Sequence, residues 1–195
     1  MDYETSVILD RLQIRMISKF FRKMFNIKTT LFPVMKVLDA LVKRFSDVLY
    51  YSVEEDVLFD PRVMAILEPQ EDGMYCIRIR QSVYNNAING DGASLGYICH
   101  EECHFILIYL FNIGPRIYTD VNGIRYARCV KEKEILPYKS MEWQAKALCG
   151  EVMIPYETCK NCSLEEIIKM TNSSKEQAKY FLNRVVVECE EEIKK

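Results

Sequence analysis

The sequence SLGYICHEECHFILIYLFN, residues 94–112, decides the fold because it predicts a long helix at the centre of the molecule. Its second half is apolar on every side, which is typical of a helix that is buried all round. Ser94 suits the N-cap position, and a Gly-Pro pair follows the predicted end of the helix. The same stretch holds both histidines of the chain, His100 and His104. Any chemistry that needs imidazole is therefore expected on this helix.

The segment H-E-E-C-H at 100–104 matches the H-E-x-x-H pattern that binds zinc on a helix. Residues four apart lie on one helix face, so His100 and His104 can bind one metal ion at about 2.0–2.1 Å. Glu101 lies about 100° around the helix, beside the metal. Zinc lowers the pKa of a bound water from about 15.7 toward 7, and Glu101 is placed to accept its proton. Glu102 is expected to face solvent or a basic neighbour. A purely structural histidine pair is the alternative.

A catalytic zinc site needs a third protein ligand and one open position. The best candidate is Glu142, which opens a predicted helix. Ala145 and Cys149 follow on the same face, and small side chains there allow close packing on the histidine helix. Glu151 is half a turn out of phase and is expected to face away. The alternative for Glu142 is an ordinary first-turn carboxylate that the helix dipole stabilises.

The eight cysteines offer a competing site. Cys159 and Cys162 form a C-x-x-C pair, so they can join His100 and His104 in a closed, structural zinc site. That arrangement leaves the glutamate of the H-E-x-x-H pattern without a role and requires a long loop to fold back. The remaining thiols are expected to be reduced and to pack as small apolar groups. They include Cys99 and Cys103.

Length and composition limit the class of protein. At 195 residues the chain fits one domain, or one domain with a small appendage. A formal net charge of -2 disfavours a general nucleic-acid-binding surface. The longest apolar run, 105–111, is far shorter than the ~20 residues that span a bilayer. The first residues are acidic and do not form a signal peptide. We therefore expect a cytoplasmic protein.

An amphipathic helix is predicted over 5–26. The apolar residues that recur at spacings of three and four are Leu9, Leu12, Met16, Phe20 and Met24. The cations that recur every four residues on another face are Arg11, Arg15, Lys19 and Lys23. The cationic face is either a solvated surface or a dock for an acidic partner.

Periodicity and turn residues predict the other elements. Helices are expected over 33–46 and over 141–154, the latter with Ser140 as its N-cap. Strands are expected over 48–53 and 74–79, a turn over 85–92 (NNAINGDG), and a hairpin over 116–130 around Asn122-Gly123. The tail, 163–193, predicts two amphipathic helices broken near 172–174. Because the tail is slightly acidic, it is expected to pack or to dock a protein, and direct nucleic-acid binding is disfavoured.

Four stretches of the chain resemble the ImmA/IrrE family of metallopeptidases. They are GMYCIRIR at 73–80, SLGYICHEECHFIL at 94–107, MEWQAKALCGEVMIP at 141–155 and SLEEIIKMTNSSKEQAKYFLNRV at 163–185. The resemblance implies that His100, His104 and Glu142 are zinc ligands and that Glu101 is the general base. Two features depart from the family pattern: the segment between the second histidine and Glu142 is long, and Cys103 replaces a glycine.

The resemblance also implies the fold and the activity. The fold would be α+β and zincin-like, with helices packed on a small, mainly antiparallel sheet. Residues 1–160 would form the metallopeptidase domain and 161–195 a helix-turn-helix-like extension. Members of the family act in the cytoplasm on a helix-turn-helix repressor, in mobile elements and stress responses. This chain is thus expected to be a zinc endopeptidase with a repressor as its protein substrate.

Two points stay open at this stage. The alternative function is a non-catalytic protein that binds a transcriptional regulator and uses zinc to hold its fold. Possible donors to a developing oxyanion, by proximity in the sequence, are Tyr97, Tyr138 and Tyr156.

Overall fold

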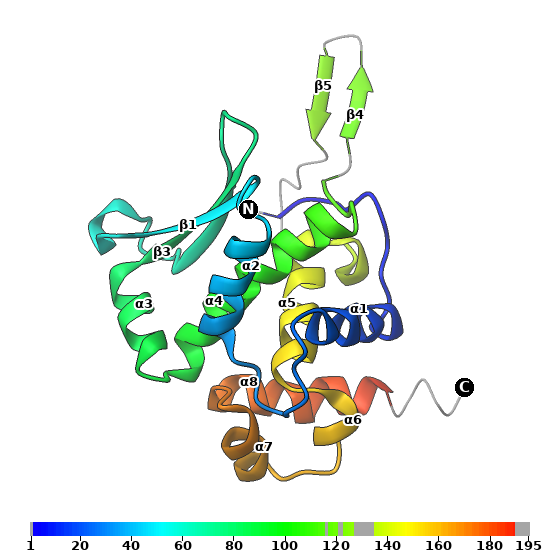
Figure 1. Ribbon diagram of the computed structural model, residues 1–195. Helices are drawn as coiled ribbons and strands as arrows, with labels where there is room; N and C mark the ends of the chain where they lie inside the picture. Colours follow the sequence, from blue (N-terminus) through cyan, green and yellow to red (C-terminus); the bar gives the residue numbers. More distant parts are fainter. Residues whose placement is uncertain (1, 116, 121–122, 127–134, 190–195) are drawn as a thin grey trace.

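The computed structural model describes residues 2–115, 117–120, 123–126 and 135–189, which form an α+β protein, as predicted (Figure 1). Helix α4 (Gly92–Phe105) lies at the centre, with α5 (Met141–Met153) packed along it and a small sheet to one side. The other helices are α1 (Arg11–Met24), α2 (Val34–Arg44), α3 (Gln81–Ile88), α6 (Tyr156–Cys159), α7 (Leu164–Thr171) and α8 (Lys175–Tyr180). Shorter helical segments are η1 (Asp56–Leu58), η2 (Ile106–Leu110), η3 (Pro137–Lys139) and η4 (Phe181–Val186).

The sheet beside α4 is mixed. Its strands are β1 (Leu49–Glu54), β2 (Ala65–Pro69) and β3 (Tyr75–Arg80), in the order β1-β3-β2. β1 runs parallel to β3, and β2 runs antiparallel to it. The expectation of a mainly antiparallel sheet is therefore wrong. Strand β2 was not predicted, because its sequence AILEP is short and ends in a proline. The sheet tolerates this proline because β2 is an edge strand.

The pairing of β2 with β3 fixes which backbone groups of β2 face the open edge. Arg80 donates its N–H to the carbonyl of Met64 at 3.2 Å. Antiparallel strands alternate between bonded and non-bonded positions, so the even-numbered residues of β2 bond to β3. Ala65 and Leu67 consequently turn their N–H and C=O groups away from β3. At this edge the N–H of Leu67 donates a hydrogen bond to the carboxylate of Glu101 on α4.

Helix α4 is the central buried helix that the sequence predicts, but it begins earlier. Asp91 is its N-cap, since the Asp91 carboxylate accepts a hydrogen bond from the N–H of Ser94 at 2.7 Å. Ser94 therefore lies in the first turn, and its prediction as the N-cap is wrong. The helix continues as the π-helical segment η2. The side chains of α4 with no exposed surface include Ile98, Cys99, Cys103 and Phe105.

The tract 85–92 is only partly a turn. Its first residues belong to α3, whose Val83 and Ala87 lie four apart and are buried against the core. This burial outweighs the preference of the asparagines for turns, which a local pattern weighs without knowing the neighbours. Gly90, with φ of +84°, makes the turn that leads into α4.

Helix α1 presents a different face to the core from the one that its periodicity suggests. Three of the expected core residues are exposed: Leu12, Met16 and Phe20. The residues of α1 that are buried instead include Ile14, Ile17, Ser18 and Phe21. Arg11 is buried over the ring of Trp143, and Arg15 lies 3.9 Å from the ring centre of Tyr156. Both predictions, the apolar face and the solvated cationic face, are therefore wrong for these residues. They are confirmed elsewhere, because Leu9 and Met24 pack in or against the core and Lys19 and Lys23 are exposed.

The C-terminal helices pack against the beginning of α4. The predicted break lies where α7 ends, at Asn172, which has φ of +54°. A side chain at Gly92 would meet the backbone at 172–174 within 2.8 Å, so only glycine permits this approach. The division of the chain at residue 160 stays a prediction.

The hairpin predicted over 116–130 has two strands in its described part, β4 (Ile117–Asp120) and β5 (Gly123–Tyr126), paired antiparallel. Figure 1 shows them projecting away from the helices. Position 122 of the expected Asn-Gly turn lies outside the described residues, as do 116 and 127–130. Among the helices of the described ranges, none combines the length and the apolar character that crossing a membrane requires.

Candidate metal centre

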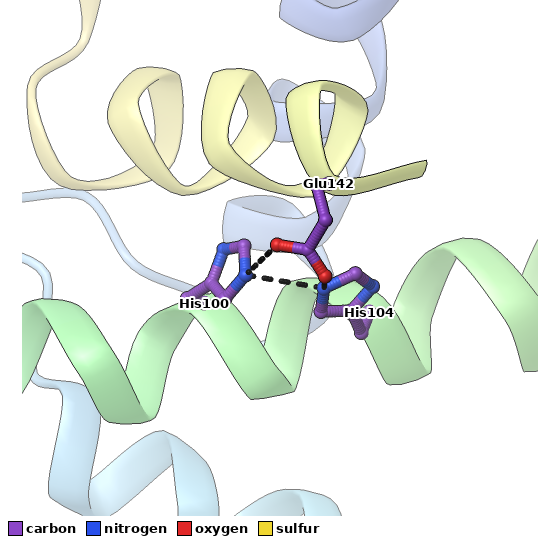
Figure 2. Close-up of side chains that lie close together, drawn as sticks. All are labelled: His100, His104 and Glu142. Carbon is purple, nitrogen blue, oxygen red and sulfur yellow. Dashed lines mark hydrogen bonds and ion pairs between the residues drawn. The ribbon is translucent and has the colours of Figure 1, made fainter. Parts of the chain in front are cut away.

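Two helices bring three ligand groups together (Figure 2). His100 and His104 lie one turn apart on α4, and Glu142 lies in the first turn of α5. The Nε2 atoms of the two histidines are 3.1 Å apart. Glu142 Oε2 is 3.3 Å from His100 Nε2, and Glu142 Oε1 is 3.3 Å from His104 Nε2. The sequence predicted all three residues as ligands, and they form one group that can hold a metal ion.

The separations suit a small cation with tetrahedral coordination. Two ligand atoms that each lie about 2.05 Å from a tetrahedral zinc ion are about 3.3 Å apart. The three ligand-atom distances given above, 3.1 and 3.3 Å, fall close to that value. The Glu142 side chain is 35% exposed, so the group is reachable from the surface. The donor set of two imidazoles and one carboxylate fits zinc and other divalent transition metals.

The three groups stabilise one another in the absence of a cation. Burial by itself raises the pKa of Glu142, but hydrogen bonds and charge attraction from the two histidines outweigh it and hold the pKa well below the usual range. Burial likewise lowers the pKa of His100, whereas Glu142 and Glu101 raise it, and the net shift is upward. A cation would replace this mutual pairing by direct ligation.

The N-terminal segment holds the beginning of α5 in place. Ser140 is the N-cap, as predicted, and its hydroxyl accepts from the N–H of Trp143 at 2.9 Å. The carboxylate of Asp2 accepts from the Ser140 hydroxyl at 2.5 Å and from the N–H of Glu142 at 3.2 Å. Asp2 thus fixes the backbone that carries the third ligand. No local signal in the sequence marks this role, because Asp2 and Glu142 are far apart along the chain.

Glu101 lies between the histidine pair and the sheet. Its Oε2 accepts a hydrogen bond of 2.8 Å from the N–H of Leu67, one of the outward-facing groups of β2. Burial raises the pKa of Glu101, and the nearby histidines partly offset that shift. A carboxylate with a raised pKa, beside a metal group and at a strand edge, is suited to accept and return a proton.

Glu102 does not face solvent, and that prediction is wrong. The residue has no exposed surface, and neither carboxylate oxygen has a hydrogen-bond partner. Burial raises its pKa well above the ordinary value, so the side chain is held in its neutral form. Other parts of the protein cover the face of α4 that carries Glu102. The position of Glu102 on the helix alone does not predict this burial.

The cysteines do not join the candidate centre. Within the described residues, the group that can hold a metal contains no thiol. Cys99 and Cys103 are buried, as predicted for thiols that pack. Cys149 is also buried, with its sulfur 3.5 Å from the carbonyl of Gly96, which confirms the close packing of α5 on α4. The alternative Cys2His2 site has no support in this arrangement.

The structure also places Glu151 and the three tyrosines that the sequence offers as possible oxyanion donors. Glu151 faces away, as expected, and pairs with Arg15 at 3.0 Å. Tyr97 lies on α4 one turn before His100 and is 44% exposed. Tyr138 is exposed just before α5, and Tyr156 is buried beneath Arg15. Of these three tyrosines, Tyr97 is the one that lies on the same helix as the two histidines.

Comparison of the chain with protein-family models, with curated proteins and with solved structures gives no match. The evidence for the α+β fold and for the His-His-Glu group therefore comes from the structure of this chain and not from relatives. The resemblance to the ImmA/IrrE family and the zincin-like arrangement stay predictions.

Proposed function

We propose that the protein is a zinc-dependent endopeptidase. The observation that carries the proposal is the convergence of three elements on one point. Two ligands come from α4, the third comes from α5, and Glu101 connects the same point to the edge of β2. A structural metal site has no need of a buried glutamate beside the ligands, whereas a hydrolytic site requires a base there.

The roles of the residues follow from their positions. When bound, zinc would supply an activated water and polarise the substrate carbonyl. His100, His104 and Glu142 would hold it. Glu101 would accept a proton at Oε1, the carboxylate oxygen that Leu67 does not bond, and pass it to the leaving amine.

The edge of β2 is suited to hold an extended polypeptide. Ala65 turns its N–H and C=O groups away from β3, and Leu67 its C=O group, and a peptide can add as a further strand through such groups. Side chains of that strand would then alternate toward and away from the metal. A helix-turn-helix repressor is the substrate that the family resemblance suggests, cleaved in a segment that becomes extended.

Metal content tests the ligand set. Elemental analysis of untagged wild type, Glu142→Gln and Cys159→Ser is expected to give about one zinc per chain in the first and third proteins. Glu142→Gln removes a charged ligand and should lose most of its zinc. Zinc lost from Cys159→Ser and kept by Glu142→Gln would overturn the proposal in favour of a structural site.

Cleavage of a candidate repressor by the zinc-loaded chain tests the base. Glu101→Gln should keep its zinc and lose cleavage by about 100-fold or more. Glu157→Gln, which changes an exposed glutamate, is the matched control and should cleave normally. Undiminished cleavage by Glu101→Gln would refute the role of the base. Repressor control that survives this substitution without cleavage would favour the non-catalytic regulator-binding protein.

A further inference from the structure

A groove begins at the candidate metal centre and runs along α4 and α5. Its volume is about 410 Å³, within the range of roughly 300–1,000 Å³ that is typical of ligand pockets. Its lining is mostly apolar. The walls come from three elements: Gly96 and Tyr97 on α4, Ala147 and Gly150 on α5, and Tyr180 and Phe181 at the end of the C-terminal helices.

Two residues join the groove to the metal ligands. His100 is itself a ligand and lines the groove. Lys146 also lines it, and its ammonium group lies 4.0 Å from Glu142 Oε2. The groove therefore opens directly beside the point where a group would bind the metal.

An exposed glycine that the helix itself does not require lines the groove. Gly150 lies within α5, its φ is not positive, and a Cβ added there would meet no atom within 4 Å. Glycine in a helix costs about 0.5–1 kcal/mol relative to alanine. Gly96 differs, because a side chain there would collide with Gln177. A larger side chain at Gly150 therefore has room to extend over the groove without meeting the protein.

The C-terminal helices close the far wall of the groove. Gln177 packs against Gly96, and Tyr180 and Phe181 follow one turn later. Charges of both signs line the groove: Lys146 and Glu176 are exposed, and Arg11 and Glu151 are buried and paired with Glu188 and Arg15. The groove therefore has no strong preference for a charged ligand. An apolar group is the occupant that this lining stabilises.

We infer that this groove binds a large apolar side chain of the peptide substrate, next to the bond that is cleaved. The inference rests on the proposed function and adds a specificity to it: leucine, methionine or an aromatic residue is preferred beside the cleaved bond. His100 belongs both to the candidate metal centre and to the lining of the groove. A peptide held at the metal can therefore place a neighbouring side chain in the groove, so the occupant is a part of the substrate. The C-terminal helices then act as part of the substrate-binding site.

Binding of hydroxamic acids to the zinc-loaded full chain tests the inference by calorimetry. Acetohydroxamic acid carries the metal-binding head alone, 3-phenylpropionohydroxamic acid adds a benzyl group, and succinic monohydroxamic acid adds a charged group of similar length. The phenyl probe should bind wild type about 10- to 100-fold more tightly than acetohydroxamic acid, from burial of the ring. The charged probe should show no such gain.

Substitutions at Gly150 locate the gain. Gly150→Leu fills the groove and should reduce the gain to about threefold or less, with zinc content and acetohydroxamic acid affinity unchanged. Gly150→Ala adds one methyl group and should keep most of the gain. Absence of the gain in wild type, or its persistence in Gly150→Leu, overturns the groove inference alone. Failure of acetohydroxamic acid to bind the zinc-loaded chain overturns the metal centre, and the groove inference falls with it.

Discussion

Helices α1 and α4 have 14 residues each, yet their sequences predict their surroundings very differently. In α4, His100 and His104 lie where their spacing places them, facing Glu142 of α5. In α1, the predicted apolar face is turned outward, with Leu12 and Met16 61% and 63% exposed. The separation of the two histidines is a distance within one helix, which spacing fixes. The buried face of a helix depends on neighbours that the spacing does not contain.

The neighbours of α1 come from the far end of the chain. Arg15 pairs with Glu151 and stacks on Tyr156, and Arg11 pairs with Glu188 at 2.9 Å. Acidic and aromatic partners make buried guanidinium groups acceptable, because their charge and hydrogen bonds are satisfied and their stems pack. Two cations of α1, Arg11 and Arg15, therefore contact the protein itself, whereas Leu12 and Met16 of its expected apolar face are turned outward.

Two adjacent phenylalanines of α1 give the largest expected effect. Phe21 has no exposed surface, and Phe20 is 50% exposed with one edge-on contact to Phe111. Phe21→Ala should lower the free energy of unfolding by about 3–5 kcal/mol, since it leaves a cavity in the core. Phe20→Ala should lower it by about 1 kcal/mol or less. Urea denaturation measures both, and equal losses would mean that α1 is rotated relative to the fold described here.

The ion pair between α1 and α5 gives the next effect. The side chains of Arg15 and Glu151 are 11% and 7% exposed. Glu151→Ala leaves a buried guanidinium without its partner and should cost about 3 kcal/mol. Arg15→Met combined with Glu151→Gln should recover most of that loss, because neither charge remains and the amide oxygen can still accept from the N–H of Tyr156. A double variant as unstable as Glu151→Ala would show that packing, rather than pairing, holds the two helices together.

The sequence predicted the candidate site more completely than the fold around it. The grouping of His100, His104 and Glu142 was predicted because H-E-x-x-H has a fixed geometry and Glu142 opens a separate helix. The role of Glu101 stays a prediction. The helical break at Asn172 and the N-cap at Ser140 were predicted because both are local. The mixed order of the sheet was missed, since strand direction depends on connections made in three dimensions. The burial of Glu102 was missed for the same reason as the buried face of α1.

On α4, the buried Glu102 is expected to affect the free energy of unfolding in a way that depends on pH. Its pKa in the folded protein is raised above its ordinary value of 4.5. Below about pH 4.5 the folded and unfolded chains both hold the proton, and the group contributes no difference. As the pH rises further, the unfolded chain releases the proton while the folded chain keeps it. Stability then falls.

Glu102→Met removes this penalty and should stabilise the protein by about 1–3 kcal/mol at pH 7. The difference in unfolding free energy between the variant and wild type, measured in urea with a chelator present, should widen from pH 5 to pH 7. Other titrating groups are common to both proteins and cancel in the difference. A gap that does not change with pH would mean that Glu102 is solvated, as the helical wheel alone predicts.

The smallest effect comes from Gly150, where α5 departs from the local rule that helices avoid glycine. Because a methyl group at this position meets no neighbour, Gly150→Ala should raise the unfolding free energy by about 0.5–1 kcal/mol. Gly96→Ala is the matched control on α4: its methyl group displaces the end of the Gln177 side chain, whose Oε1 accepts from the N–H of Ser174 at 2.8 Å, so this variant should not be stabilised. Thermal denaturation of both variants compares them directly. A stabilised Gly150→Ala that still binds the phenyl probe would separate the two properties of this glycine: its backbone freedom weakens α5, and its lack of a side chain opens the groove.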